Sequence, residues 1–328
     1  MVSVALATYN SKKYIIEQLT SIVRQKVSVD EVIIQDDCSK DDTIEVITKY
    51  IHDNNLKNWK IEKNEKNLGY ILTFKKAIQR CNGDIIILCD HDDIWFENKS
   101  EIIKKIFNDK EKVLALATSF VEIDENGKKR NTKIKKGHAN NNLIRHSIKK
   151  EKLNKMNFED VAIYNISPGC TCAFSSKIKN DLLKKDYLMP HDLQIMNIAA
   201  LKDGLFYYDI ITTKYRIYSN NTIGLGHQTD YEKRLKLVQN GLKEKEEIKR
   251  LIGNIDNSKK QEIRTINKII HAFELRKKMM ETQNILKYGF ITLINSLGLN
   301  KLYESVIMDI ITIVKKQIRV KGISYGRK

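Results

Sequence analysis

Apolar and polar residues alternate along the first part of the chain in blocks that predict strands followed by helices. Short apolar runs, typical of buried strands, occur at 2–7, 31–35, 59–63 and 84–89. Helices are predicted at 11–23, 39–50 and 69–81. The signals are apolar residues at helical spacing, capping residues, or turn residues at the ends. This alternation predicts an α/β fold with a mostly parallel sheet and helices on both faces. Ligands of such sheets bind at the carboxyl ends of the strands.

Beyond the fourth predicted strand the pattern is less regular. A further strand is expected at 115–123, and the basic stretch 128–137 is interpreted as a mobile loop. Residues 167–174 combine turn formers with small side chains, which permit close approach of the backbone to a ligand. Residues 187–200 predict a helix that begins near Asp192, and helix capping is the simplest role for this side chain.

From residue 231 onward the pattern is helical and basic. Glycines and polar residues at 224–229 interrupt the pattern, which predicts a first domain at 1–226 and a helical region at 227–328. The chain has a net charge of +17, and residues 231–328 contribute +12 of it, from 22 basic and 10 acidic residues. Acidic partners are therefore expected for this region.

The cysteines and the start of the chain bear on where the protein works. Five cysteines without zinc-finger spacing are predicted to be small, buried and reduced: Cys38, Cys81, Cys89, Cys170 and Cys172. The chain opens on an apolar strand that is too short and too uncharged in front for a signal peptide. No run of about 18 uncharged apolar residues predicts a membrane span. These features predict a cytoplasmic protein.

Acidic side chains follow two of the predicted strands. Asp90, Asp92 and Asp93 come directly after the fourth strand, and Asp36 and Asp37 end the second. Both clusters are expected at the ligand edge of the sheet, where crowded carboxylates repel one another. A divalent cation would relieve this repulsion, and hard oxygen ligands favour Mg²⁺ or Mn²⁺ over zinc. The alternative is a solvated acidic turn without a ligand.

The glycine-rich motifs of common nucleotide-binding folds are absent. The first strand ends on Ala7, Thr8, Tyr9 and Asn10, with no glycine for a pyrophosphate to approach. A Walker A lysine loop is also missing from the chain. The sequence therefore excludes the dinucleotide fingerprint and the P-loop.

Seven landmarks in order resemble the inverting glycosyltransferases of family 2, and within it the rhamnosyltransferase-like enzymes that build bacterial surface polysaccharides. They lie within residues 2–224, at Ala7–Asn10, Gln35–Thr43, Asn67–Gly69, Cys89–Trp95, Pro168–Cys170, His191–Asp192, and Tyr215–Arg216 with Asn220–Gly224. The resemblance implies a fold called GT-A, in which a nucleotide-binding α/β sheet merges with an acceptor-binding half.

The resemblance also implies roles for individual residues. Asp37 would accept hydrogen bonds from the nucleotide base, Asp90 would face the base or ribose, and Asp92 would hold the metal that bridges the donor diphosphate. Asp192 would be the catalytic base, because a single inverting displacement needs one group to take the acceptor proton. Further donor contacts implied by the resemblance are Thr8, Tyr9, Asn10, Asn67, Gly69 and Trp95. Further implied metal ligands are Asp93 and His227. The implied acceptor contacts are Gly169, Cys170 and His191.

The chain departs from the family pattern near the implied site. His91 stands between the acids where the family commonly has glutamine, and Tyr218 stands where it often has histidine. Tyrosine is a poor Mg²⁺ ligand, so either His227 substitutes or the metal is held by fewer protein ligands. Leu193 and Gln194 replace a tryptophan expected near the base, which leaves the acceptor identity open.

The function predicted is transfer of a sugar from a nucleotide-diphosphate sugar to a hydroxyl of a glycan or lipid-linked acceptor. The alternative is a non-enzymatic binding protein whose basic region contacts nucleic acid or an anionic membrane. Residues 231–328 contain no nucleic-acid reader motif with interleaved aromatics, so a membrane surface on the inner face of the cell membrane is favoured. An equally open alternative for residues 231–328 is a helical appendage that completes the fold or forms an oligomer interface.

Overall fold

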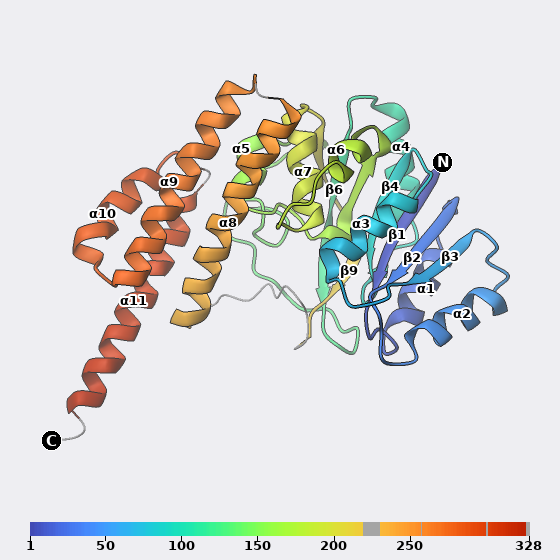
Figure 1. Cartoon of the computed structure of the whole chain (residues 1–328), viewed down its shortest axis with the longest axis horizontal. Helices are drawn as coiled ribbons and strands as arrows, with labels where there is room; N and C mark the ends of the chain where they lie inside the picture. The colour runs from blue at the N-terminus through green and yellow to red at the C-terminus, as the bar shows by residue number, and fades with distance from the viewer. Residues whose placement is uncertain (219–229, 257, 300, 326–328) are drawn as a thin grey trace. The chain divides into compact units, whose positions relative to one another are not determined.

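The computed structural model describes residues 1–218, 230–256, 258–299 and 301–325, and the chain forms two compact units (Figure 1). Unit 1 comprises Met1–Asn157 and Asn165–Ile223, and unit 2 comprises Phe158–Tyr164 and Gly224–Lys328. The predicted domain boundary at 226/227 lies among residues 219–229, outside the described residues.

Unit 1 contains a mixed sheet in the order β3-β2-β1-β4-β8-β6-β9-β5, with β7 paired to β9. The strands β1 to β4 pair in parallel with one another, and β6 pairs in parallel with β9. The strand β8 is antiparallel to β4 and β6, and β5 and β7 are antiparallel to β9. The strands are β1 (Val2–Thr8), β2 (Glu31–Asp36), β3 (Trp59–Lys63), β4 (Ile85–Asp90), β5 (Ile94–Trp95), β6 (Ala115–Ile123), β7 (Leu153–Lys155), β8 (Cys172–Ser175) and β9 (Leu205–Arg216).

The central strands are buried along almost their whole length. Every residue of β1 and β2 is buried, and in β4 only the last residue is partly exposed. Strands covered on both faces have near-continuous apolar runs in place of alternation. This is why the sequence predicts β1, β2, β4 and β6 closely, whereas β3 is a partly exposed strand at the end of the sheet. The predicted α/β architecture is confirmed.

The helices of unit 1 cover the sheet. Within this unit α3 contacts β1, β2, α6 and α7, and α1 contacts α2 and β5 (Figure 1). The predicted helix start at Ser11 is wrong, because Ser11 makes a turn through its hydroxyl and carbonyl and α1 begins at Ile15. The helices are α1 (Ile15–Val23), α2 (Thr43–Asp53), α3 (Tyr70–Arg80), α4 (Lys99–Asp109), α6 (Lys179–Leu183) and α7 (His191–Leu201).

Several elements lie outside the predicted ones. The turn predicted at 167–174 is only half right: a 3₁₀ helix at Gly169–Thr171 leads directly into β8. The strands β5, β7 and β9 were also not predicted, and β9 pairs with β6, β5 and β7. Residues 128–137 contain no helix, and Lys129 forms an isolated bridge with Ile123.

The described part of unit 2 is helical, as the sequence predicted. Its core contains Val238, Met279, Val306 and Ile313. Beside it the fully buried Asp309 accepts hydrogen bonds from Nε of Arg234 at 2.6 Å and Nε of Arg276 at 2.8 Å. The helices are α5 (Phe158–Ile163), α8 (Tyr231–Ile255), α9 (Lys260–Thr282), α10 (Ile285–Ser296) and α11 (Leu302–Tyr325). Among the described helices, none is both long and apolar enough to cross a bilayer.

Candidate active site

The two acidic clusters end at the same edge of the sheet. Strand pairing sets Thr8 of β1 beside Asp36 of β2 and sets Ala7 beside Asp90 of β4. The two clusters are therefore separated by one strand. The expectation that both lie at the carboxyl edge of the parallel strands is confirmed.

Asp36 organises the loop after β1. Its carboxylate accepts hydrogen bonds from the Thr8 hydroxyl at 2.9 Å and from the backbone and hydroxyl of Ser39 at 2.8 and 2.5 Å. The side-chain oxygen of Asn10 accepts a hydrogen bond from the Lys40 amide at 2.9 Å, and the backbone of Asn10 has a φ of 48°. The structure thus places Thr8 and Asn10 in a hydrogen-bonded frame, while Tyr9 is exposed.

Asp37 joins the second strand to the loop that precedes α3. Its buried carboxylate accepts hydrogen bonds from the amides of Leu68 at 2.7 Å and Gly69 at 2.8 Å. The Asn67 side chain donates to the Asp37 carbonyl at 3.2 Å. Gly69 has a φ of 80°, a conformation that favours glycine. Asp37, Asn67 and Gly69 therefore form one hydrogen-bonded cradle, and their contact with a donor stays a prediction.

Asp90, Asp93 and Cys170 form a compact group that could hold a metal ion. One ligand atom of each lies within 4.8 Å of the others. Asp93 is fully buried, and Oδ1 accepts a hydrogen bond from the Arg216 amide at 2.9 Å. Its other oxygen, Oδ2, has no hydrogen-bond partner within the described part of the chain. An orphaned buried carboxylate oxygen beside a second carboxylate fits a divalent cation.

The electrostatics of this group also favour a cation. Burial, reinforced by the neighbouring Asp92, raises the pKa of Asp93 to about 7. Burial and the charges of Asp93 and Asp92 likewise raise the pKa of Asp90 well above its ordinary value. Carboxylates that resist ionisation side by side gain most from a bound divalent cation, because the cation removes their mutual repulsion.

Asp92 turns toward a tyrosine. Its Oδ2 accepts a hydrogen bond from the Tyr218 hydroxyl at 2.8 Å, so the residue that replaces the family histidine contacts an acid of this cluster. His227, the predicted substitute, lies outside the described residues. Tyr218 therefore orients the Asp92 carboxylate by donating a hydrogen bond to it, and this role does not require Tyr218 to bind metal.

A buried lysine lies beneath the acids, and the sequence analysis missed it. Lys99 is fully buried, and Nζ donates to the Cys170 carbonyl at 2.5 Å and the Thr213 hydroxyl at 3.0 Å. Nζ also lies 4.1 Å from the Trp95 ring centroid. Burial lowers the pKa of Lys99. One lysine at a helix start gives no sequence signal of burial, because most lysines in such positions are solvated.

Trp95, a predicted donor contact, packs on Lys99 and lines a cavity of about 640 Å³ beside α1 and β5. Its ring nitrogen has no hydrogen-bond partner among the described residues. The cavity is also lined by Glu17, Ser21 and Lys214. The structure places the Trp95 ring against the lysine under the acids.

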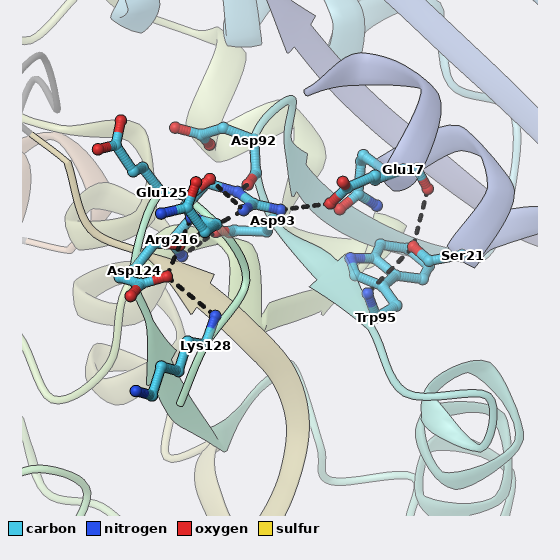
Figure 2. Close-up of polar contacts among 11 residues, drawn as sticks. Glu17, Ser21, Asp92, Asp93, Trp95, Asp124, Glu125, Lys128 and Arg216 are labelled. Atoms are coloured by element: carbon cyan, nitrogen blue, oxygen red, sulfur yellow. Dashed lines mark hydrogen bonds and ion pairs between the residues drawn. The ribbon is translucent and has the colours of Figure 1, made fainter. Parts of the chain in front are cut away.

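Arg216 ties the acidic loop to two other segments (Figure 2). Its guanidinium is 1% exposed, and Nε donates to the Asp92 carbonyl at 2.8 Å. Nη1 donates to the Glu125 carbonyl at 3.1 Å, and Nη2 pairs with Glu17 at 2.5 Å. The ring of Tyr14 lies 4.5 Å from the guanidinium carbon. Arg216 therefore fixes Asp92 and Asp93 against α1 and the loop after β6.

Asp192 lies in the first turn of α7, where Pro190 occupies the N-cap position, so the simpler capping role is wrong. Its carboxylate accepts hydrogen bonds from the Leu193 amide at 2.9 Å and from Asn165 at 2.7 Å. Burial raises the pKa of Asp192. The charge of Asp192 is also one of the causes of the raised pKa of Asp90.

Of the three predicted acceptor residues, Gly169 and His191 lie beside Asp192, and Cys170 lies beside the other acids. A Cβ on Gly169 would lie 3.4 Å from both the Asp192 Cβ and Nε2 of His191, so the 3₁₀ turn closely approaches them. The His191 ring stacks on Phe74 with centroids 3.8 Å apart. Burial lowers the pKa of His191 to about 3, so the ring is neutral near pH 7. Cys170 is buried beside the acids.

Comparison with known proteins identifies the family of the chain. Residues 3–176 match the family model described as Glycosyl transferase family 2. The dTDP-rhamnosyl transferase RfbG of Shigella flexneri is 26% identical over 264 residues, which cover 74% of this chain and 82% of RfbG. The poly(ribitol-phosphate) beta-N-acetylglucosaminyltransferase TarS of Staphylococcus aureus is 37% identical over 93 residues, which cover 28% of this chain and only 16% of TarS.

Solved structures share the fold. TarS 1–349 in complex with UDP superposes with a TM-score of 0.56 at 18% identity, covering 98% of this chain and 91% of that one. The mannosyltransferase PcManGT of Pyrobaculum calidifontis, in complex with GDP-Man and Mn²⁺, gives a TM-score of 0.50 at 15% identity, covering 97% and 86%. These likenesses confirm the GT-A fold. The family model matches more than half of the length of this chain, so the chain belongs to glycosyl transferase family 2.

Proposed function

We propose that the protein is a metal-dependent, inverting transferase that moves a hexosyl or deoxyhexosyl group from a nucleotide-diphosphate sugar to an acceptor hydroxyl. The observation that carries the proposal is the group of Asp90, Asp93 and Cys170 at the ligand edge of the sheet, with Gly169 of the same turn placed so that a Cβ on it would lie 3.4 Å from the Asp192 Cβ. A glycan or lipid-linked acceptor in surface polysaccharide synthesis is supported by similarity to a dTDP-rhamnosyl transferase and a poly(ribitol-phosphate) glycosyltransferase.

The acids would hold Mg²⁺ or Mn²⁺. Asp93 supplies a buried oxygen without a partner in the described chain, and Asp90 and Asp92 are its neighbours. When bound, the cation neutralises charge that develops on the diphosphate leaving group. Burial raises the pKa of the Cys170 thiol well above its ordinary value, so this sulfur stays protonated. A neutral, soft thiol is a poor Mg²⁺ ligand, and Cys170 would line the site.

The donor nucleotide would occupy the cradle after β1 and β2. Asp37 holds the Asn67–Gly69 loop through two backbone amides and also accepts from the Asn64 side chain, so its one remaining lone pair would accept a hydrogen bond from the base. Thr8 and Asn10 keep the neighbouring loop in place, which leaves the exposed Tyr9 ring available for the nucleotide. Preorganised loops of this kind lower the entropy cost of donor binding.

Asp192 would take the proton of the acceptor hydroxyl. Its burial raises its pKa and makes the carboxylate a stronger base, while Asn165 and the Leu193 amide fix its direction. A single displacement at the anomeric carbon needs only this base, and it inverts the configuration. His191 stays neutral, so with Gly169 it would shape the acceptor side without supplying charge.

Family membership favours an enzyme over the non-enzymatic binding protein. For the cellular setting we propose a cytoplasmic protein that works at the inner face of the membrane, where a lipid-linked acceptor would be presented. Oligomerisation through unit 2 is compatible with this setting, and nucleic acid is not proposed as a partner.

A panel of nucleotide sugars tests the function directly. Purified protein is incubated with each sugar, with and without Mn²⁺, and release of nucleoside diphosphate is measured. The expected result is metal-stimulated release with one donor class, and NMR of the product shows an inverted anomeric centre. Retention of configuration would refute the single-base mechanism.

A further inference from the structure

The helix α10 in unit 2 carries large apolar residues on both sides, because Ile285, Tyr288 and Leu293 pack against the core of the unit while others point outward. Its buried positions hold small or polar residues, Gly289, Thr292 and Ser296. Its outward side carries large apolar residues, including Leu286 at 98% and Phe290 at 73% exposure. Surface helices normally turn their apolar side chains inward. We call the outward residues the α10 stripe: Leu286, Phe290, Ile291, Ile294 and Leu297.

The neighbouring helix α11 has a second outward apolar stripe. Leu302, Val306 and Ile313 are buried on one side of this helix. The other side bears the α11 stripe, whose members recur at helical spacing: Ile307, Ile311, Val314 and Ile318. The two helices contact one another, and a Cβ on Gly289 would lie 3.8 Å from Cδ1 of Ile310. Exposed apolar side chains in this number on two helices that contact one another are typical of an interaction site.

The charges that α10 and α11 themselves contribute are mostly positive, although Lys316 pairs with Glu232 of α8 at 3.0 Å. Residues 285–319 contain two acids, and one of them, Asp309, is buried between Arg234 and Arg276. The same range contains five basic residues: Lys287, Lys301, Lys315, Lys316 and Arg319. Lys287 is exposed and directly follows Leu286 of the α10 stripe. Basic side chains beside an apolar face are typical of helices that lie on anionic membranes.

Charge also decides between a membrane and a second copy of this chain. In a two-fold symmetric contact through these stripes the lysines of both copies would come together, and like charges across an interface oppose association. An anionic lipid surface supplies the opposite charge and an apolar layer at the same time. A membrane therefore satisfies both features of unit 2.

We propose that the α10 and α11 stripes are the surface by which the protein attaches to a membrane that contains anionic phospholipid. The inference rests on the proposed function, because a lipid-linked acceptor gives the enzyme a reason to be there. Leu286 and Phe290 enter the boundary between headgroups and acyl chains, and Lys287 contacts lipid phosphate. Attachment is peripheral and reversible.

Vesicle co-sedimentation of the full chain tests this proposal. Vesicles of phosphatidylcholine alone are compared with vesicles that also contain phosphatidylglycerol. Leu286→Glu/Phe290→Glu removes two apolar side chains that are exposed and therefore unnecessary for the core. The matched control, Leu188→Glu/Leu237→Glu, makes the same chemical change at exposed positions outside both stripes. Transfer to a soluble acceptor is measured in parallel.

The expected result is binding to the anionic vesicles that weakens at high salt and falls at least about tenfold in the stripe variant but not in the control. Equal binding of stripe variant and wild type would overturn the proposal. Equal binding of the wild type to neutral and anionic vesicles would also overturn it. So would a wild-type oligomer that becomes a monomer in the stripe variant while both proteins sediment equally with vesicles, because the stripes would then be an interface between copies of the chain. Failure of transfer to the soluble acceptor in all variants would count against the proposed function alone.

Discussion

Replacing Arg216 by lysine tests whether the acidic loop depends on the guanidinium (Figure 2). Lysine keeps the charge and the backbone amide that donates to Asp93, but it has one side-chain nitrogen where arginine uses three. The buried Asp92 carbonyl loses its donor at 2.8 Å, which costs about 1–3 kcal/mol. The Glu17 pair adds at most about 1 kcal/mol, since Glu17 is 56% exposed.

The loss of stability is therefore expected to be about 1–4 kcal/mol, which lowers the melting temperature of unit 1 by roughly 2–16 °C. Tryptophan fluorescence reports this unit alone, because the two tryptophans of the chain, Trp59 and Trp95, are both buried in it. The exposed Arg24, changed to lysine, is the control.

The same variant should weaken the metal site. Since Arg216 holds Asp92 and Asp93 without being a proposed ligand, the Mn²⁺ concentration for half-maximal activity is expected to rise by about tenfold or more. Turnover at saturating Mn²⁺ should fall less. An Arg216→Lys protein with the melting temperature and the Mn²⁺ requirement of the Arg24→Lys control would refute the reasoning.

Three further predictions concern the site. Asp192→Asn should lower kcat by about 10²-fold or more with donor affinity near wild type, measured by steady-state kinetics and calorimetry. Because burial raises the pKa of Asp192 and the base must be ionised, wild-type kcat/KM should rise with pH through a value above the ordinary 3.8, and Asp192→Asn should lose this limb. Asp92→Asn should weaken metal-dependent binding of nucleoside diphosphate strongly, and unchanged calorimetric affinity would contradict the assignment. Lys99→Met should lower the fluorescence melting temperature of unit 1, because the buried Cys170 carbonyl loses its donor, and an unshifted transition would show that this contact is dispensable.

Much of the site could be predicted from local sequence. Asp36, Asp37 and Asp90 end strands whose apolar runs are long enough to identify, and parallel strands bring their carboxyl ends to one edge. Asp192 follows a proline at a helix start and was found through the family landmarks. The strand-end acids depend on neighbours in the chain, so the sequence alone places them, whereas the role of Asp192 comes from the resemblance and stays a prediction.

Tertiary structure decided the contacts that link distant segments. The sequence could not show that Lys99 is buried under the acids, because its hydrogen-bond partners, Cys170 and Thr213, lie 71 and 114 positions further along the chain. The same holds for Arg216, whose partner Glu17 is 199 positions distant, and for the pairing of Tyr218 with Asp92. The outward stripes of α10 and α11 were also hidden, since periodicity identifies an apolar face but packing decides whether that face turns inward or outward.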